Sequence, residues 1–261
     1  MSKRLSGRVA IVTGAAEGIG NAIAELFCQH GAKVCVAGTN VVLGNAFVER
    51  MVEQGLEAEF VQTDVADKEA ILRMVNHTVL LWGTVDVLVN NAGFIQRNFD
   101  VAATPDQDWQ AMFDVNLRGM WHCCQAVIPH MKASGSGSIV NMGSVHSFKE
   151  VPNTFPYPVT KHAIIGLTRS LAVEFGEHNI RVNVICPGTV ETPNAMRTFA
   201  RADDPKEARQ NIAAIHPLKR NASMQEIAYP ALFLASQESS FMTGESMVVD
   251  GGRSVVYNHP A

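Results

Sequence analysis

Arg8-Val-Ala-Ile-Val-Thr-Gly-Ala-Ala-Glu-Gly-Ile-Gly20 decides the fold of this chain: it is a short apolar run followed by three spaced glycines. Residues 8–13 predict a buried parallel strand. Apolar residues at helical spacing predict a helix directly after it: Ile19, Ile23, Leu26 and Phe27. Gly14, Gly18 and Gly20 permit a tight turn and let the backbone approach a pyrophosphate, which the helix N-terminus favours. The stretch therefore predicts the first unit of a dinucleotide-binding domain.

The rest of the chain repeats this alternation of strand and helix. Further strands are predicted at 33–37, 59–63, 85–89, 138–142, 180–185 and 246–249, and helices at about 41–54, 67–81, 108–133, 157–176 and 224–235. Every connection is long enough to carry a helix. We therefore predict one α/β domain over residues 1–261, with a doubly wound (Rossmann) parallel seven-stranded sheet of order 3-2-1-4-5-6-7 and helices on both faces.

Residues from about 190 to 222 interrupt this alternation. They are polar and poorly periodic, with Asp-Asp-Pro and His-Pro breakers. A long insertion of this kind is typical of a lid that closes over substrate and excludes water.

Composition excludes several classes of function. The net charge of −4 offers no basic surface, so neither nucleic acid nor an anionic membrane is an expected partner. No apolar run reaches the length of about 20 residues that spans a bilayer, and the first residues are too few and too polar for a signal peptide, so a cytoplasmic location is expected. The five cysteines lie in apolar runs without metal-ligand spacing, which predicts core packing and no metal site.

Ser144, Tyr157 and Lys161 offer three groups that can handle a proton on one small oxygen. A helix that begins near Tyr157 places it one turn from Lys161 on the same face. An ammonium held near a tyrosine favours the phenolate. Ser144 follows the apolar run 138–142, so its hydroxyl is expected at the carboxyl end of a strand, where open α/β sheets bind ligands. Tyr-x-x-x-Lys alone is a weak motif, because amphipathic helices often begin this way.

Together, the glycine turn, the serine and the Tyr-x-x-x-Lys pair resemble the short-chain dehydrogenase/reductase family over nearly the whole chain. The resemblance implies that Ser144 polarises the substrate oxygen and that Tyr157 exchanges its proton. Lys161 is implied to assist the tyrosine and to hold the nicotinamide ribose. Asn116 matches the asparagine that interrupts a helix in this family and holds a water between the lysine and solvent, so it is implied to be the fourth catalytic residue.

Three further stretches match cofactor-binding motifs of the family. Asp64-Val65 matches the pair that binds the adenine amino group, and Asn90-Asn-Ala-Gly93 matches a motif beside the adenosine. In Pro187-Gly-x-x-x-Thr192, the Val190 backbone and Thr192 would contact the nicotinamide carboxamide or the pyrophosphate. The implied cofactor-binding residues are Gly14, Glu17, Gly18, Ile19, Gly20, Gly38, Thr39, Asp64, Val65, Asn91, Ala92, Gly93, Tyr157, Lys161, Pro187, Gly188, Val190 and Thr192.

The choice between NAD and NADP depends on two positions. NAD enzymes of the family usually carry an Asp after the second strand, where this chain has Gly38 followed by Thr39. NADP enzymes usually carry a basic residue there or before the second fingerprint glycine, where this chain has Glu17. A carboxylate near a 2′-phosphate repels it, which favours NAD. Gly38 and Thr39 leave space and a hydroxyl, so use of NADP stays open.

The resemblance implies an NAD(P)-dependent oxidoreductase that interconverts a secondary alcohol or hemiacetal hydroxyl with a carbonyl. The alternative is a catalytically idle nucleotide-binding or scaffold protein of the same fold. Polar residues near the site favour a sugar or other polyol as substrate. His146 and Asn153 are predicted to contact it. The other polar residues near the site are Lys149 and Glu150, between Ser144 and Tyr157, and Gln96 and Arg97, just after the Asn-Asn-Ala-Gly motif.

We also expect a homotetramer. The helices at 108–133 and 157–176 carry apolar residues on more than one face: Met120, Trp121, Val127, Ile128, Ile164, Ile165, Leu167 and Leu171. In the family, these two helices form one dimer interface, and the last helix and strand form another.

Overall fold

A parallel sheet forms the centre of the molecule. The computed structural model describes residues 3–95 and 101–256, and within them seven strands form one sheet of order β3-β2-β1-β4-β5-β6-β7. The strands are β1 (Val9–Thr13), β2 (Lys33–Gly38), β3 (Ala58–Gln62), β4 (Val87–Asn90), β5 (Gly137–Met142), β6 (Ile180–Pro187) and β7 (Ser246–Val249). The predicted order is confirmed. Strands β1 to β3 follow one another toward one edge of the sheet, and β4 to β7 follow one another toward the other edge. The strand order therefore switches between the neighbouring strands β1 and β4, and such a switch point opens a crevice at the carboxyl ends of the strands.

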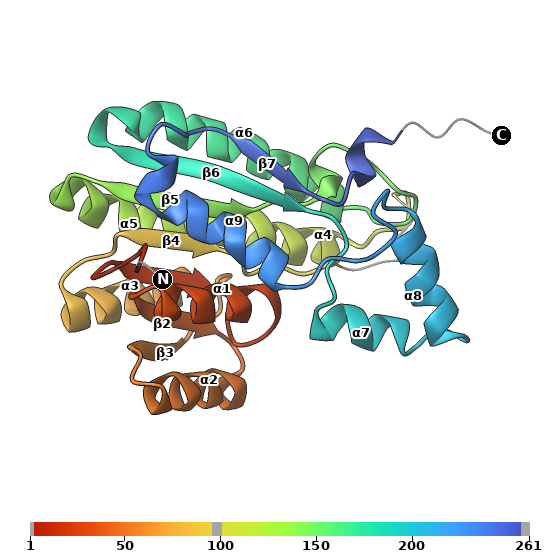
Figure 1. The fold of residues 1–261 in the computed structure, drawn as a ribbon. Coiled ribbons are helices and arrows are strands. Elements are labelled where there is room, and N and C mark those ends of the chain that lie inside the picture. The colour runs from red at the N-terminus through yellow and green to blue at the C-terminus, as the bar shows by residue number, and fades with distance from the viewer. Residues whose placement is uncertain (1–2, 96–100, 257–261) are drawn as a thin grey trace.

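Helices cover both faces of the sheet (Figure 1). One face carries α1 (Gly18–Gln29), α2 (Val41–Glu53) and α9 (Gln225–Ala235). The other carries α3 (Lys68–Trp82), α5 (Met120–Ser134) and α6 (Tyr157–Phe175). Because the sheet is covered on both sides, its central strands are mostly apolar, and all of β1 is buried.

The helix predicted at 108–133 is not continuous. It consists of α4 (Asp106–Phe113), a π-helical turn at Asp114–Gly119 and α5. Asn116 lies inside the π-helical turn and is fully buried. A π-turn of this kind often marks a functional site in a longer helix.

The predicted lid contains two helices that the sequence analysis missed, α7 (Pro193–Phe199) and α8 (Pro205–Ala214). Each begins with a capping residue followed by proline. Thr192 Oγ1 accepts from Ala195 N at 3.1 Å, and Asp204 Oδ1 accepts from Lys206 N and Glu207 N at 2.9 Å each. Such a pair favours the start of a helix, so the Asp-Pro taken as a breaker is a helix signal. Both helices lie at the carboxyl edge of the sheet (Figure 1).

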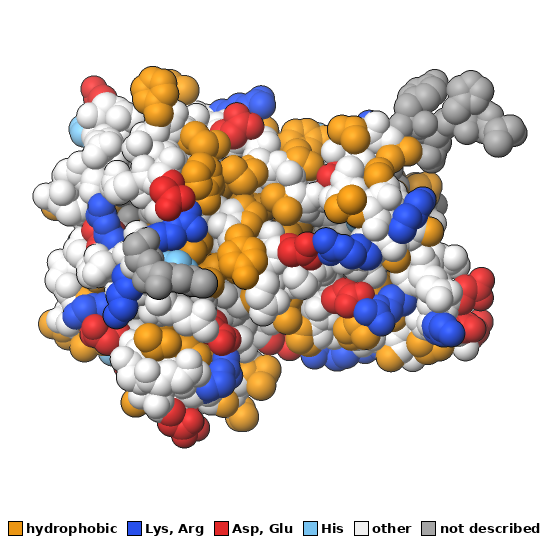
Figure 2. Space-filling model, in the orientation of Figure 1, with side chains coloured by type: hydrophobic (Ala, Val, Ile, Leu, Met, Phe, Trp, Pro, Cys, Tyr) orange, Lys and Arg blue, Asp and Glu red, His pale blue; other side chains and the backbone are white. Residues whose placement is uncertain are grey.

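Most apolar residues named for the tetramer are already buried within the subunit, which corrects that part of the prediction. Of that set, Met120, Val127, Ile128, Ile164 and Ile165 pack against the sheet, and Trp121 stays 45% exposed. Over α9 and β7, hydrophobic side chains gather on the surface (Figure 2), among them Tyr229 and Val248.

All five cysteines are buried and unbridged, as predicted. No helix within the described residues is both long and apolar enough to cross a bilayer.

Candidate active site

A cavity of about 630 Å³ opens at the carboxyl edge of the strands. It runs from the ends of β2 and β3 to the ends of β5 and β6, and α7 and α8 contribute to its wall. Every residue predicted to bind the cofactor lines it except Gly20. Of the predicted catalytic residues, Ser144, Tyr157 and Lys161 line the cavity and Asn116 does not.

The glycine turn is fixed by its packing on the loop after β4. Gly14 has a φ of +63°, and a Cβ there would lie 2.8 Å from Ala92 Cα, so only glycine fits. Gly20 lies beneath the turn, where a Cβ would lie 2.6 Å from Gly14 O, which explains its absence from the cavity wall. Asn91 Nδ2 donates to the carbonyls of Thr13 and Gly14, each at 3.0 Å. Asn91 therefore holds the turn in place as well as lining the cavity.

The N-terminus of α1 opens into the cavity. Helix α1 begins at Gly18, and within the described chain its N-cap residue Glu17 makes no side-chain cap. Uncapped N–H groups at a helix N-terminus, together with the helix dipole, favour a phosphate group. Glu17 instead pairs with Arg197 of α7, with Arg197 Nη2 2.8 Å from Glu17 Oε1. This ion pair joins α7 to the glycine turn.

Ser144 stands directly after β5, in a short turn that is tied to α6. Its Oγ accepts from His146 N at 3.2 Å. Ser147 Oγ accepts from Ser144 N at 3.3 Å and donates to Lys161 O at 2.8 Å. These bonds fix the serine turn relative to the helix that carries Tyr157 and Lys161.

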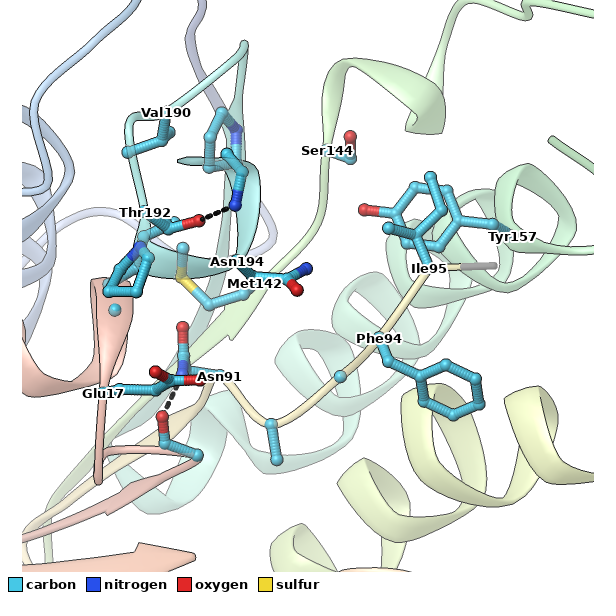
Figure 3. A pocket seen from close by; sticks show the side chains of 18 of the residues that line it. Glu17, Asn91, Phe94, Ile95, Met142, Ser144, Tyr157, Val190, Thr192 and Asn194 are labelled. Atoms are coloured by element: carbon cyan, nitrogen blue, oxygen red, sulfur yellow. Dashed lines mark hydrogen bonds between the residues drawn. The ribbon is translucent and has the colours of Figure 1, made fainter. Parts of the chain in front are cut away.

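Tyr157 and Lys161 project from the first two turns of α6 into the same end of the cavity. Lys161 Nζ lies 5.5 Å from the centroid of the Tyr157 ring and donates to Met142 O at 2.7 Å. Burial lowers the pKa of Lys161 to about 8, so the amine stays mainly protonated at neutral pH. Figure 3 shows Ser144 and Tyr157 at one end of the cavity and Glu17 and Asn91 at the other.

The side chain of Asn116 makes hydrogen bonds to the loop after β4. Its Oδ1 accepts from Phe94 N and its Nδ2 donates to Phe94 O, each at 2.9 Å. Its Nδ2 also lies 3.4 Å from Thr160 Oγ1, one residue before Lys161. Asn116 thus ties the cavity wall at Phe94 to α6.

The far end of the cavity is acidic. Gly38, Thr39 and Asp64 line it, and Asp64 Oδ1 accepts from Ala66 N at 2.9 Å. A Cβ on Gly38 would lie 3.5 Å from Ala16 Cβ, an ordinary contact, so a larger side chain fits there. Among the described residues that line the cavity, the carboxylates are Glu17 and Asp64. No lysine or arginine of this lining comes from the loops after β1, β2 or β3.

Of the two predicted substrate contacts, His146 lies in the cavity and Asn153 does not. His146 is buried, and its ring centroid lies 5.7 Å from that of Tyr157, edge on. Asn153 is exposed, has a φ of 62° and lines a second cavity with Glu150 and His162, because the loop turns away from Ser144 before α6 begins. Lys149 is exposed as well, and Gln96 and Arg97 lie outside the described residues.

Several residues of the cavity wall were missed by the sequence analysis. They include Phe94, Met142, Asn194, Ile212 and Arg253. Asn194 extends from α7 toward the middle of the cavity (Figure 3). The cap-proline pair before α7 is the signal that could have placed Asn194, and Arg253 follows a Gly-Gly pair just beyond the last strand.

Comparison with known proteins gives one consistent result. A family profile described as Enoyl-(Acyl carrier protein) reductase matches residues 14–254. The 3-oxoacyl-[acyl-carrier-protein] reductase FabG of Thermotoga maritima is 38% identical, covering 95% of this chain and 98% of its own. The structure of L-sorbose reductase from Gluconobacter frateurii, complexed with NADPH and L-sorbose, has a TM-score of 0.94 at 31% identity, covering 98% of this chain and 100% of its own. The structure of a gluconate 5-dehydrogenase from Burkholderia cenocepacia J2315, complexed with NADP and tartrate, has a TM-score of 0.90 at 31% identity and covers 98% of each chain.

Proposed function

Because the chain belongs to the short-chain dehydrogenase/reductase family of NAD(P)-dependent oxidoreductases, we propose that it interconverts a secondary alcohol or hemiacetal hydroxyl with the corresponding carbonyl compound. One observation carries this proposal. Ser144, Tyr157 and Lys161 come from two elements that are tied together, and they line the same cavity as the uncapped N-terminus of α1. The relatives are named as reductases and dehydrogenases, which favours an enzyme over an idle protein of the same fold.

Each catalytic residue is proposed to act through the contacts described above. Ser144 Oγ would hydrogen-bond the substrate oxygen, and Tyr157 Oη would exchange a proton with that oxygen. Lys161, protonated at neutral pH and close to the Tyr157 ring, would stabilise the phenolate. The π-helical turn at Asn116 supports a relay of protons from Lys161 toward solvent, with Asn116 as its fourth member.

The cavity fits a nicotinamide dinucleotide. When bound, the nicotinamide supplies or accepts the hydride. The N-terminus of α1 would hold the pyrophosphate, and Asp64 and Thr39 would lie beside the adenosine. The Asp64 carboxylate would repel a 2′-phosphate, whereas the charge of Glu17 is balanced by its ion pair with Arg197; on the Asp64 charge we propose a preference for NAD over NADP.

We propose that the α7–α8 segment is a lid over this site. Its helices contribute Asn194, Phe199 and Ile212 to the cavity wall, and the Glu17–Arg197 ion pair joins it to the glycine turn. A second ion pair between Arg209 of α8 and Glu191 joins it to the loop that follows β6. Lids of this kind exclude water while the hydride moves.

The proposed substrate is a sugar or other polyhydroxylated molecule. The cavity is lined by hydrogen-bonding side chains from His146, Thr189 and Asn194. A purely apolar substrate would need fewer such groups. Two of the structural relatives are named for sugars or sugar acids, which supports this class.

We propose a homotetramer as well. Exposed apolar side chains remain on α5 and α6, at Trp121 and Val173, and around α9 and β7, at Tyr229, Phe241 and Val248. Those over α9 and β7 lie on the face seen in Figure 2. Large apolar patches of this kind mark contacts between subunits, and two different two-fold contacts generate a tetramer.

The function is tested by following reduced nicotinamide absorbance with NAD or NADP and a panel of sugars, sugar acids, polyols and hydrophobic alcohols. Oxidation of polyhydroxylated compounds with NAD is the expected result. Cofactor binding without turnover of any compound would instead favour the idle protein, and activity confined to hydrophobic alcohols would exclude the proposed substrate class.

A further inference from the structure

A buried imidazole outside the catalytic group joins α8 to the loop that follows β6. His216 lies just after α8, its Nε2 accepts from Thr189 N at 3.2 Å, and its Nδ1 lies 3.0 Å from Ile212 O. Because a backbone N–H can only donate, Nε2 carries no proton, and the neutral ring holds its proton on Nδ1 and donates it to the Ile212 carbonyl. The ring therefore bridges two backbone groups in one defined tautomer.

Close packing against backbone holds the His216 ring in place. A Cβ on Gly188 would lie 3.0 Å from His216 Nε2, and a Cβ on Gly251 would lie 3.5 Å from His216 Cβ. The ring thus packs between the loop after β6 and the turn after β7. A side chain packed in this way keeps one orientation, so the bond to Thr189 N is a fixed feature of the cavity wall.

The next peptide group along the loop presents a donor to the cavity. Thr189 O accepts from Ala222 N at 2.9 Å, and the N–H of a trans peptide points opposite to its carbonyl. Val190 N therefore points away from Ala222, and among the described residues no group accepts from it. Val190 lines the cavity, so this N–H can donate to a ligand. Its position depends on Thr189, which His216 holds.

We propose that His216 is a positioning residue for the nicotinamide: by holding Thr189, it keeps Val190 N–H directed at the carboxamide of the cofactor, a role that rests on the function proposed above. The effect is confined to this end of the cavity. Strand β6 lies three strands from β1, which is about 14 Å at about 4.8 Å per strand, so the pyrophosphate and adenosine end is out of reach of the ring. Because Ile212 lines the cavity from α8, the same ring links the proposed lid to the nicotinamide end.

Two substitutions separate the bond to Thr189 from the bond to Ile212. In His216→Gln, the side-chain oxygen can take the place of Nε2 and accept from Thr189 N, whereas the shorter amide of His216→Asn can take only the place of Nδ1 and donate to Ile212 O. Each protein is titrated calorimetrically with NADH and with ADP-ribose, which lacks the nicotinamide. In His216→Asn, the Kd of NADH should rise by about three- to tenfold, as for loss of a hydrogen bond, while the Kd of ADP-ribose stays within about twofold. His216→Gln should restore most of the NADH affinity, and the control His77→Asn, at an exposed position of α3, should change neither Kd.

The pattern of affinities separates this proposal from a structural role and from the catalytic proposal. An equal loss of affinity for NADH and ADP-ribose in His216→Asn, or a variant that binds neither, would reduce His216 to a structural role. Unchanged NADH affinity in His216→Asn, or the same loss in His216→Gln, would overturn the bond to Thr189 as the cause. A parent protein that binds neither ligand would overturn the proposed function itself. The expected affinities without turnover of any alcohol would support the role of His216 and overturn only the catalytic proposal.

Discussion

Lys161→Met should make the protein more stable while removing its activity. The Lys161 ammonium is buried, and its pKa falls from 10.5 to about 8 because burial penalises the charged form. At about 1.4 kcal/mol per pKa unit, this corresponds to a penalty of about 3 kcal/mol at neutral pH. Methionine also removes the bond to Met142 O, which costs about 1 kcal/mol. The variant should therefore be about 2 kcal/mol more stable than the parent.

The gain in stability should depend on pH in a defined window. Between pH 8 and pH 10.5 the unfolded chain binds the Lys161 proton and the folded protein does not, so stability of the parent rises with pH there. The penalty is fully present below pH 8 and is lost as the pH approaches 10.5. The advantage of Lys161→Met should thus shrink steadily above pH 8.

Urea unfolding of the cofactor-free protein measures this difference at about pH 7 and about pH 9.5. The protein concentration is held constant, because the proposed tetramer would unfold in a concentration-dependent way. Lys68→Met, at an exposed position of α3, is the control and should change the free energy of unfolding by less than about 0.5 kcal/mol. A Lys161→Met variant that is less stable than the parent at pH 7, or equally shifted at both pH values, would refute the reasoning.

Three further results are expected. Gly38→Asp should raise the ratio of kcat/KM for NAD to kcat/KM for NADP by about 10- to 100-fold, because the new carboxylate would bind both ribose hydroxyls. The control variant Gly38→Asn should not raise this ratio. An unchanged ratio in Gly38→Asp would mean that the adenosine lies elsewhere. Arg197→Gln should speed release of the reduced cofactor about two- to fivefold in stopped-flow fluorescence, and this difference from the parent should be smaller at high salt. Identical release rates would show that the Glu17–Arg197 ion pair does not hold the proposed lid closed. Phe241→Asp should lower the mass measured by light scattering from tetramer to dimer, and Val42→Asp should not; a parent monomer at micromolar concentration would rule out the tetramer.

The order of the sheet could be predicted because each unit of the sequence carries its own signals. The apolar run before Gly14 and the long crossovers indicate a doubly wound parallel sheet, and the order 3-2-1-4-5-6-7 fits them. Ser144, Tyr157 and Lys161 could be placed together for the same reason, since one follows a strand and the other two share a helix face.

Loop directions and long-range partners could not be predicted in this way. Asn153 stands as close to Tyr157 in sequence as many active-site residues do, yet its loop with a φ of 62° faces another cavity. The hydrogen bonds from the Asn116 side chain to the Phe94 backbone depend on the distance between the π-helical turn and the loop after β4. No local sequence pattern encodes that distance. Arg253 enters the cavity only because β7 pairs with β6.

The turnover of Tyr157→Phe tests the central claim most directly, because this change removes the phenolic hydroxyl and little else. With a substrate that the parent oxidises, kcat should fall by at least about 100-fold, the loss expected for removal of a group that transfers a proton. The Kd of the reduced cofactor, measured by fluorescence titration, should stay within about twofold of the parent, since a change of this size is below about 0.5 kcal/mol. A variant that keeps its turnover within about tenfold of the parent would show that Tyr157 is not the proton-exchanging residue of this cavity.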